Sequence, residues 1–228
     1  MIFKQVFDKK SSTYTYLIAS SQGREALIID PVLENVDNYV KLLKNLDLRL
    51  VKVIDTHIHA DHVTGASKLK DLTKCSTIMG EHTPAEAVDI KIKHDEYIYL
   101  DNLKIRAIHT PGHTSDSFSF LMDNYLFSGD TLLINGTGRT DFQNGNSKDA
   151  YNSIFNKLLK LPEETLLYPA HDYKGEKVST IGKEKKFNPR LQVNSVDEYI
   201  EIMNNLNLKK PISIDENISR NLKLGSKS

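Results

Sequence analysis

The sequence predicts an α/β fold with two groups of strands. In the first third of the chain, strand-like segments alternate with amphipathic helical segments, and beyond Ser76 short strand-like segments follow one another closely. A length of 228 residues is enough for one large core. We therefore expect a single domain over residues 1–228, with residues 195–224 as a C-terminal extension packed on it.

The first group contains three predicted strands and two predicted helices. The strands are expected at residues 13–18, 26–30 and 50–55, where β-branched and aromatic residues are frequent. The first helix lies between the last two strands and the second covers residues 64–72. The apolar residues of the first helix recur at helical spacing and are Val36, Tyr39, Val40, Leu43 and Leu46.

The second group is expected to be mostly antiparallel. Its strands are predicted at residues 77–79, 97–100, 104–109, 117–122 and 125–127. Asp123-Asn124 fits the turn of a hairpin, and Ser147 is expected to cap a helix that ends before Pro162. That helix would bury Tyr151, Ile154, Phe155, Leu158 and Leu159. A strand at 166–168 and a helix from Ser195 to about Leu206, opened by a capping box, complete the prediction.

Composition excludes several classes of function. The 30 basic and 30 acidic residues balance, so no global charge favours nucleic acid or an anionic membrane, and we expect a small substrate. Cys75 is the single cysteine, which excludes an internal disulfide framework. The start, Met1–Gln5, lacks a signal-peptide core and no apolar run suggests a membrane span. A cytoplasmic bacterial protein is expected, or an organelle-matrix protein if a transit peptide was removed.

The densest chemical signal is His57-Ile58-His59-Ala60-Asp61-His62, directly after a predicted strand. It places four candidate metal ligands in six residues, and a strand end can direct several ligands to one point. A polar loop with locally bonded histidines would be the better interpretation of one isolated histidine. The cluster favours a metal site.

Three further candidate ligands lie at later strand ends: His113 in Thr-Pro-Gly-His, Asp130 in Phe-Ser-Gly-Asp, and His171 in Tyr-Pro-Ala-His. In this order, the motifs resemble those of the metallo-β-lactamase superfamily. The resemblance implies a four-layer αββα sandwich of two mixed β-sheets flanked by helices, with the motifs along one edge. One fold hosts unrelated reactions, so the reaction needs other evidence.

Other segments resemble the persulfide dioxygenases, which are sulfur dioxygenases of this superfamily. Gly138-Arg139-Thr140-Asp141-Phe142-Gln143 is the most discriminating of them, because hydrolytic relatives share the His-x-His-x-Asp-His motif. The others are the run 168–173, Asn188-Pro189-Arg190-Leu191 and the run 204–211. The resemblance extends from about Phe3 to Leu224.

The resemblance implies one Fe(II) per chain, bound by His57, His113 and Asp130. Two histidines and a carboxylate form a facial triad that leaves open positions on iron. Glutathione persulfide, O2 and water would be converted into sulfite and glutathione. The remaining motif residues would surround the iron without binding it and would orient its ligands. These residues are His59, Asp61, His62 and His171.

Candidates for binding the glutathione part are Arg139, Arg190 and Tyr173. Guanidinium groups pair with carboxylates through two hydrogen bonds, and the tyrosine hydroxyl could donate to the same ligand. Two structural alternatives stay open: Arg139 could pair with Asp141 and pin a loop, and Arg190 could cap a helix. The chain departs from many relatives at Ser115-Asp116, which would change loop stiffness or add a charge near the site.

Two other functions are compatible with these motifs. The first alternative is a glyoxalase II-like hydrolase of acylglutathione thioesters with two metal ions. The chain has only one clear predicted helix after Asn188-Pro189-Arg190, whereas those hydrolases have a longer helical domain. A noncatalytic metal- or thiol-binding scaffold would be favoured by loss of a ligand, and none is missing. The resemblance also implies a homodimer and, without an attached sulfurtransferase domain, a separate sulfurtransferase partner.

Overall fold

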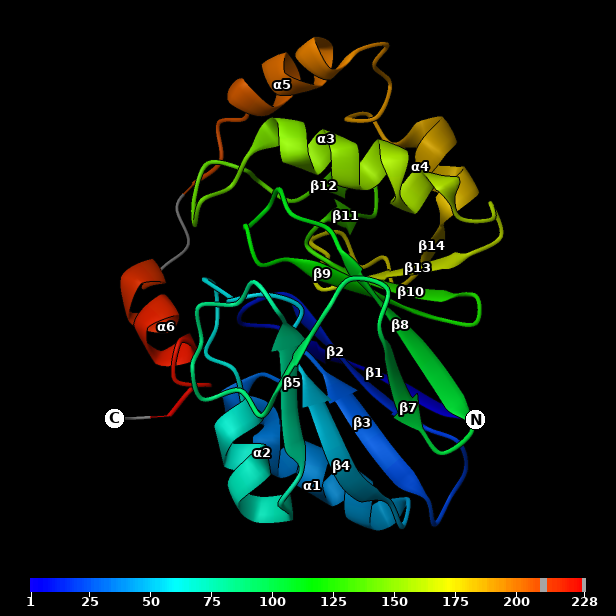
Figure 1. The fold of residues 1–228 in the computed structure, drawn as a ribbon, viewed down its shortest axis with the longest axis vertical. Helices are drawn as coiled ribbons and strands as arrows, with labels where there is room; N and C mark the ends of the chain where they lie inside the picture. The colour runs from blue at the N-terminus through cyan, green and yellow to red at the C-terminus, as the bar shows by residue number, and fades with distance from the viewer. Residues whose placement is uncertain (210–212, 227–228) are drawn as a thin grey trace.

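The computed structural model describes residues 1–209 and 213–226 and has four layers, helix, sheet, sheet and helix (Figure 1). The predicted four-layer αββα architecture is confirmed. The end of the 204–211 motif and residues 227–228 of the C-terminal tail lie outside the described residues. Among the described residues, no helix is both long and apolar enough to cross a membrane.

The first sheet is mixed and has its strands in chain order. Strands β1 to β3 pair antiparallel and strands β3 to β6 pair parallel. The half-buried edge strand β1 and the short β6 were not predicted. The strand predicted at residues 77–79 was wrongly placed in the second group, because β5 pairs parallel with β4 in this first sheet. The strands are β1 (Ile2–Asp8), β2 (Thr13–Ala19), β3 (Glu25–Ile29), β4 (Arg49–Ile54), β5 (Ser76–Gly80) and β6 (Ile90–Ile92).

The second sheet has the order β14-β13-β10-β9-β8-β7, and only β10 and β13 pair parallel. The prediction of a mostly antiparallel sheet is confirmed, as is the hairpin turn at Asp123-Asn124 between paired Met122 and Tyr125. Its strands are β7 (Tyr97–Leu100), β8 (Leu103–His109), β9 (Phe118–Met122), β10 (Tyr125–Gly129), β13 (Leu166–Pro169) and β14 (Ser179–Thr180). A small ribbon pairs β11 (Leu132–Leu133) with β12 (Gly136–Thr137).

Helices cover the outer face of each sheet (Figure 1). Along β3, Leu27 and Ile29 point into the core between the sheets, whereas Ala26 and Ile28 pack under the helices. This alternation is expected of a strand buried on both faces. The first sheet is covered by α1 (Val36–Asn45) and α2 (Ala66–Thr73), and the second by α3 (Ser147–Asn156) and α4 (Ile181–Phe187). The helix α5 (Val196–Asn204) packs on the outer side of α3.

Several helix predictions need correction. Asn146, not Ser147, caps α3, because its side chain accepts a hydrogen bond from the Asp149 amide. Leu158 and Leu159 belong to a separate 3-10 turn and not to α3. The Ser195 cap of α5 is confirmed, although the helix ends at Asn204. The expectation of one helix after Asn188-Pro189-Arg190 is wrong, since α6 (Ile214–Asn221) follows α5. The helix α4, which ends before Asn188, was not predicted.

Candidate metal centre and its pocket

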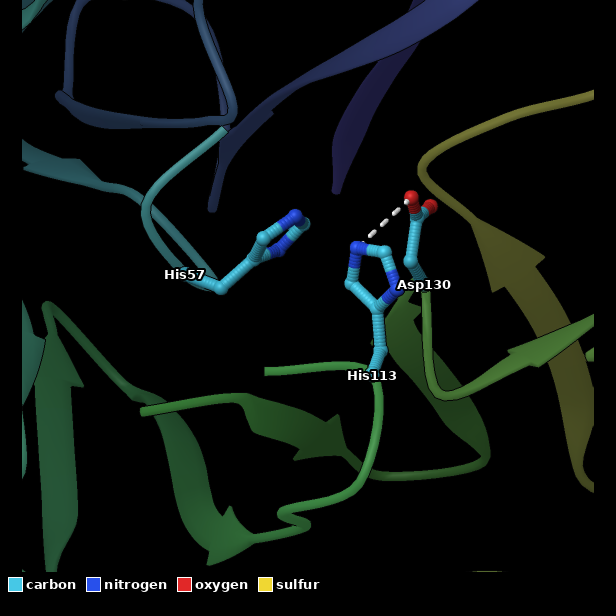
Figure 2. A group of neighbouring side chains, drawn as sticks. All are labelled: His57, His113 and Asp130. Atoms are coloured by element: carbon cyan, nitrogen blue, oxygen red, sulfur yellow. Dashed lines mark ion pairs between the residues drawn. The ribbon is translucent and has the colours of Figure 1, made fainter. Parts of the chain in front are cut away.

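The three predicted ligands meet at the ends of strands from both sheets (Figure 2). His57 follows β4, His113 lies between β8 and β9, and Asp130 follows β10. One ligand atom from each lies within 4.8 Å of the other two. His113 Nε2 is 3.5 Å from Asp130 Oδ2. The tertiary structure therefore joins residues from distant parts of the chain into a group that can bind one metal ion.

Each of these ligands has a second polar atom that is already held by the protein. Nδ1 of His57 is 3.0 Å from the Thr56 hydroxyl, and Nδ1 of His113 donates to the Arg139 carbonyl at 2.8 Å. Asp130 Oδ1 is 2.7 Å from His171 Nδ1. These bonds leave Nε2 of both imidazoles and Oδ2 of the carboxylate for a metal ion. Such outer contacts set the tautomer and orientation of metal ligands.

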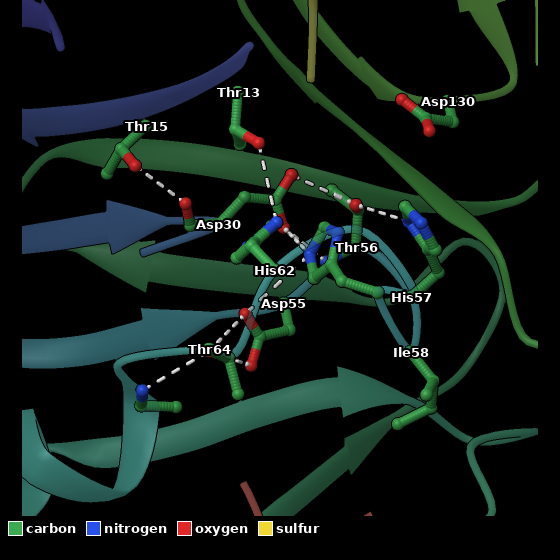
Figure 3. A network of polar contacts seen from close by, with 12 residues as sticks. Thr13, Thr15, Asp30, Asp55, Thr56, His57, Ile58, His62, Thr64 and Asp130 are labelled. Atoms are coloured by element: carbon green, nitrogen blue, oxygen red, sulfur yellow. Dashed lines mark hydrogen bonds and ion pairs between the residues drawn. The ribbon is translucent and has the colours of Figure 1, made fainter. Parts of the chain in front are cut away.

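Thr56 connects His57 to the buried carboxylate of Asp30 (Figure 3). The Thr56 amide donates to Asp30 Oδ1 at 2.7 Å and its hydroxyl donates to Oδ2 at 3.0 Å. Because the hydroxyl hydrogen points to Asp30, the hydroxyl oxygen accepts from Nδ1–H of His57. This tautomer leaves His57 Nε2 unprotonated, as metal binding requires.

The environment favours the ligating protonation states. Burial, followed by the neighbouring His59 and His113, lowers the pKa of His57 well below 6.5. Burial raises the pKa of Asp130, but the surrounding histidines, His171 first, outweigh it and hold the pKa below 3.8. A neutral imidazole and an ionised carboxylate are the forms that bind metal.

The other four motif residues surround this group. His171 lies between two carboxylates, 2.8 Å from Asp61 Oδ2 and 2.7 Å from Asp130 Oδ1. His62 Nδ1 is 2.9 Å from Asp61, and His59 Nε2 is 3.1 Å from Asp30. Burial lowers the pKa of His59, but Asp30 and other carboxylates raise it to about 9.

Two nitrogen atoms in this surrounding shell have no partner. His59 Nδ1 and His62 Nε2 are buried without a hydrogen bond among the described residues. Together with Asp61, these histidines form a second group whose ligand atoms lie within 4.8 Å of one another. The geometry alone therefore offers donors for a second ion beside the first.

A cavity of about 550 Å³ opens beside the candidate metal ligands. His113, Asp130 and His171 contribute to its wall, and Arg139 and Arg190 add positive charge. Its size suits a peptide-sized ligand. Apolar parts of the wall come from Leu133, Ile134, Phe142, Leu208 and Ile214.

The Arg139 guanidinium is bound by the protein itself. Nε and Nη2 donate to the two Asp141 oxygens at 2.6 and 2.7 Å, and Nη1 donates to the Lys209 carbonyl at 2.7 Å. Nη2 also donates to the Leu208 carbonyl at 3.3 Å, and the group stacks on Phe142. The loop-pinning alternative is thus present, and a contact between Arg139 and substrate stays a prediction.

Arg190 and Tyr173 are less restrained. Nη1 of Arg190 donates to the carbonyl and hydroxyl of Thr137, and within the described residues no other guanidinium nitrogen of Arg190 has a hydrogen bond. These contacts do not cap a helix. Tyr173 lies at the rim of the cavity with 74% of its surface exposed, and its ring stacks beside that of His171.

Sequence reasoning missed residues that hold the ligand loops. The backbone of Ile58, next to His57, donates to Asp116 and accepts from the Gln143 side chain at 2.6 Å. Asp116 is buried and burial raises its pKa, so this departure from many relatives ties two loops together rather than exposing a charge. Asp30 holds the same loop by accepting hydrogen bonds from Thr56. Its place at the end of a predicted strand was a signal that sequence reasoning could have used.

Comparison with protein families is consistent with this geometry. The model of the metallo-β-lactamase superfamily matches residues 9–96 and 87–171. The human mitochondrial persulfide dioxygenase ETHE1 is 41% identical over 228 residues, covering 99% of this chain and 89% of that protein.

A solved structure and a more distant relative complete the comparison. The crystal structure of ETHE1 from Myxococcus xanthus has a TM-score of 0.96 at 45% identity, covering 99% of this chain and 100% of that one. A hydroxyacylglutathione hydrolase of Dictyostelium discoideum is 32% identical, covering 70% of this chain and 62% of that protein. The similarity to the hydrolase is therefore lower and less complete.

Proposed function

From the premise that the chain belongs to the metallo-β-lactamase superfamily and, within it, to the persulfide dioxygenases, we propose that it oxidises glutathione persulfide at a single Fe(II) ion. The overall reaction consumes O2 and water and yields glutathione and sulfite. A persulfide substrate and oxygen follow from the family; glutathione as the carrier, iron as the metal and one ion per chain are our proposals.

The observation that carries the proposal is the set of donor atoms left by the protein's own bonds. His57, His113 and Asp130 each keep one atom for the metal while the other is held by Thr56, Arg139 and His171, respectively. Two imidazoles and one carboxylate are the donors of the non-haem iron oxygenases. Iron bound there would supply open coordination positions and redox chemistry. Zinc could also bind substrate but has no redox chemistry.

The number of ions is the point on which dioxygenase and hydrolase differ. One ion is supported by His171, whose two nitrogens are taken by Asp61 and Asp130, and by His59 Nε2, which is bound to Asp30. The unpartnered nitrogens of His59 and His62 favour the hydrolase with two ions. The higher identity to the persulfide dioxygenases supports the proposal of one ion.

The cavity wall supports glutathione as the carrier of the reactive sulfur. Glutathione has two carboxylates, and Lys174, Lys209 and Arg190 contribute positive charge around the cavity. Arg190 is the strongest candidate for a carboxylate ligand, because most of its donors are uncommitted and a guanidinium can pair with a carboxylate. Tyr173 at the rim would donate its hydroxyl to the same substrate.

Metal analysis combined with oxygen uptake tests the function. We expect about one iron per chain and oxygen consumption that depends on glutathione persulfide. Two zinc ions per chain, no oxygen uptake and hydrolysis of lactoylglutathione would establish the hydrolase instead. His113→Ala should abolish turnover, whereas Arg190→Ala should mainly raise KM, because Arg190 would bind the substrate and its transition state alike.

Two partner proposals follow from the same family. A homodimer is checked by light scattering of the purified protein, and a mass of 25.9 kDa would show a monomer instead. A separate sulfurtransferase would supply the persulfide, and a coupled assay with purified components would detect the transfer. For location, we propose the bacterial cytoplasm or an organelle matrix, which fractionation of the source cells would test.

A further inference from the structure

The C-terminal helix α6 has a buried face that is polar. Asn217 and Asn221 lie one helical turn apart, with only 8% and 2% of their surfaces exposed. In Figure 1, α6 (red) lies apart from α5 (orange). Buried amides need hydrogen-bond partners, because an unsatisfied buried amide destabilises the fold. The hydrogen-bond partners of Asn217 and Asn221 indicate the role of α6.

Both asparagines bond to the backbone of the loop that follows His57. Asn221 Nδ2 donates to the carbonyls of His59 and His62 at 2.8 Å each, and its Oδ1 accepts from the Thr64 amide at 2.9 Å. Asn217 Nδ2 donates to the Ala60 carbonyl at 2.9 Å. Residues about 160 positions away in the chain thus satisfy four backbone groups of residues 59–64, three of them in the metal motif.

The chain after α6 continues this contact. Gly225 lies against the same loop, with φ +82 and so close that a Cβ there would be 2.0 Å from the Thr64 carbonyl oxygen. The Leu224 carbonyl accepts from the Ser67 amide at 3.0 Å, and its side chain packs with Leu69 of α2. Two separate sets of contacts therefore fix where α6 sits on the loop.

The same helix also reaches the cavity. Ile214, its first residue, lines the wall of the cavity that contains His113 and Asp130. One end of α6 therefore shapes the space for substrate, while its buried face holds the backbone of residues 59–64. The loop carries His59, Asp61 and His62, so its path sets how these side chains surround the metal ligands.

We propose that α6 is a positioning element of the metal centre, with Asn221 as its principal positioning residue. This inference rests on the proposed function only in that residues 59–64 surround the iron. The amide group is required, because a carboxylate of the same shape could accept from Thr64 but could not donate to the carbonyls of His59 and His62. Asn217, with one bond, has a smaller effect.

Asn221→Asp tests the proposal, and Ser219→Ala on the exposed face of α6 is the matched control. We expect hydrogen exchange of the 59–64 amides in the metal-free variant to become at least about tenfold faster, while strands β8 to β10 keep their protection. Anaerobic titration with Fe(II) alone should show a dissociation constant raised by up to about 10-fold, the lower end of the range for direct partners of metal ligands, because Asn221 acts through residues that surround the ligands. Ser219→Ala should change neither quantity.

The outcomes separate this inference from the proposed function. If Asn221→Asp leaves loop exchange and iron affinity at wild-type values, the inference is overturned, even if thermal stability falls. If wild type binds no iron, the proposed function fails, and the exchange of the metal-free loop still decides the role of α6. Asn217→Ala provides the same measurements with a smaller change should Asn221→Asp not fold, and unchanged loop exchange in it would overturn the inference.

Discussion

Gly129 packs against Thr56 so closely that a Cβ at position 129 would lie 2.8 Å from the Thr56 hydroxyl oxygen. Gly129 directly precedes the proposed ligand Asp130, and Thr56 directly precedes the proposed ligand His57. The loops from the two sheets therefore meet at a contact that only glycine permits. This contact helps to set the distance between the two ligands.

Gly129→Ala should weaken both the fold and metal binding. The residue has φ +54, which costs a side-chain-bearing residue about 1–2 kcal/mol, and the methyl group would also displace Thr56. Gly175→Ala is the control, because Gly175 has φ +85 but open space around it. Urea unfolding and iron content should show a larger loss for position 129. Equal losses at both positions would contradict a role for the Thr56 contact.

Thr56→Val should reduce iron affinity about 10-fold or more, because it removes the hydroxyl that orients His57 and keeps a similar shape. Thr56→Ser keeps the hydroxyl and should restore most of the affinity. Anaerobic Fe(II) titration measures this, and NMR of the His57 ring nitrogens in the metal-free protein reports the tautomer. Equal affinity in the valine and serine variants would show that the hydroxyl does not position His57.

Asp141→Asn distinguishes two roles of Arg139. If Arg139 acts by holding the 208–209 segment at the cavity wall, loss of its carboxylate partner should raise KM about three- to fivefold, since an ion pair with a solvent-exposed partner contributes up to about 1 kcal/mol. Asp95→Asn, which removes the partner of Arg106 on the surface, is the control. An unchanged KM in Asp141→Asn would instead favour direct substrate binding by Arg139.

The lowered pKa of Asp89, a residue outside the candidate site, predicts that the stability of the fold depends on pH. The Lys70 ammonium, followed by bonds from Thr77, holds the pKa of Asp89 below 3.8. A carboxylate with a lowered folded-state pKa stabilises the fold above its unfolded pKa and loses this effect as pH falls through the folded pKa.

Asp89→Asn should accordingly lower the free energy of unfolding at pH 7 by up to about 1 kcal/mol, as expected of an exposed pair. The difference from wild type should shrink as the pH falls below 4. Urea unfolding at several pH values measures it. A difference that stays constant down to the lowest pH at which the protein folds would show that charge is not its source.

Local patterns were sufficient to predict most strands and the candidate metal ligands at their ends, whereas the choice of three direct ligands came from the family resemblance. Alternating apolar residues marked strands such as β3, and His57, His113 and Asp130 each follow a strand that the sequence predicts. Strand ends are local features, so one stretch of sequence is enough to recognise each. The family resemblance then predicted that these three residues form one metal site.

Helix α6 shows where this reasoning stopped. Its buried face carries Asn217 and Asn221, so its hydropathy pattern does not indicate a buried helix, and Ser213 before it makes no side-chain cap. These amides are buried because they donate hydrogen bonds to the carbonyls of His59, Ala60 and His62. No local pattern contains that information.

The sequence by itself determined the fold class, the strand ends that carry ligands and the chemical type of each ligand, because these depend on residue type and short-range periodicity. Only the tertiary structure decided which atom of each ligand is free. That choice depends on hydrogen bonds such as those from Thr56 to Asp30 and from His113 to Arg139. Such bonds join residues distant in the chain, and they form only when the tertiary structure brings these segments together.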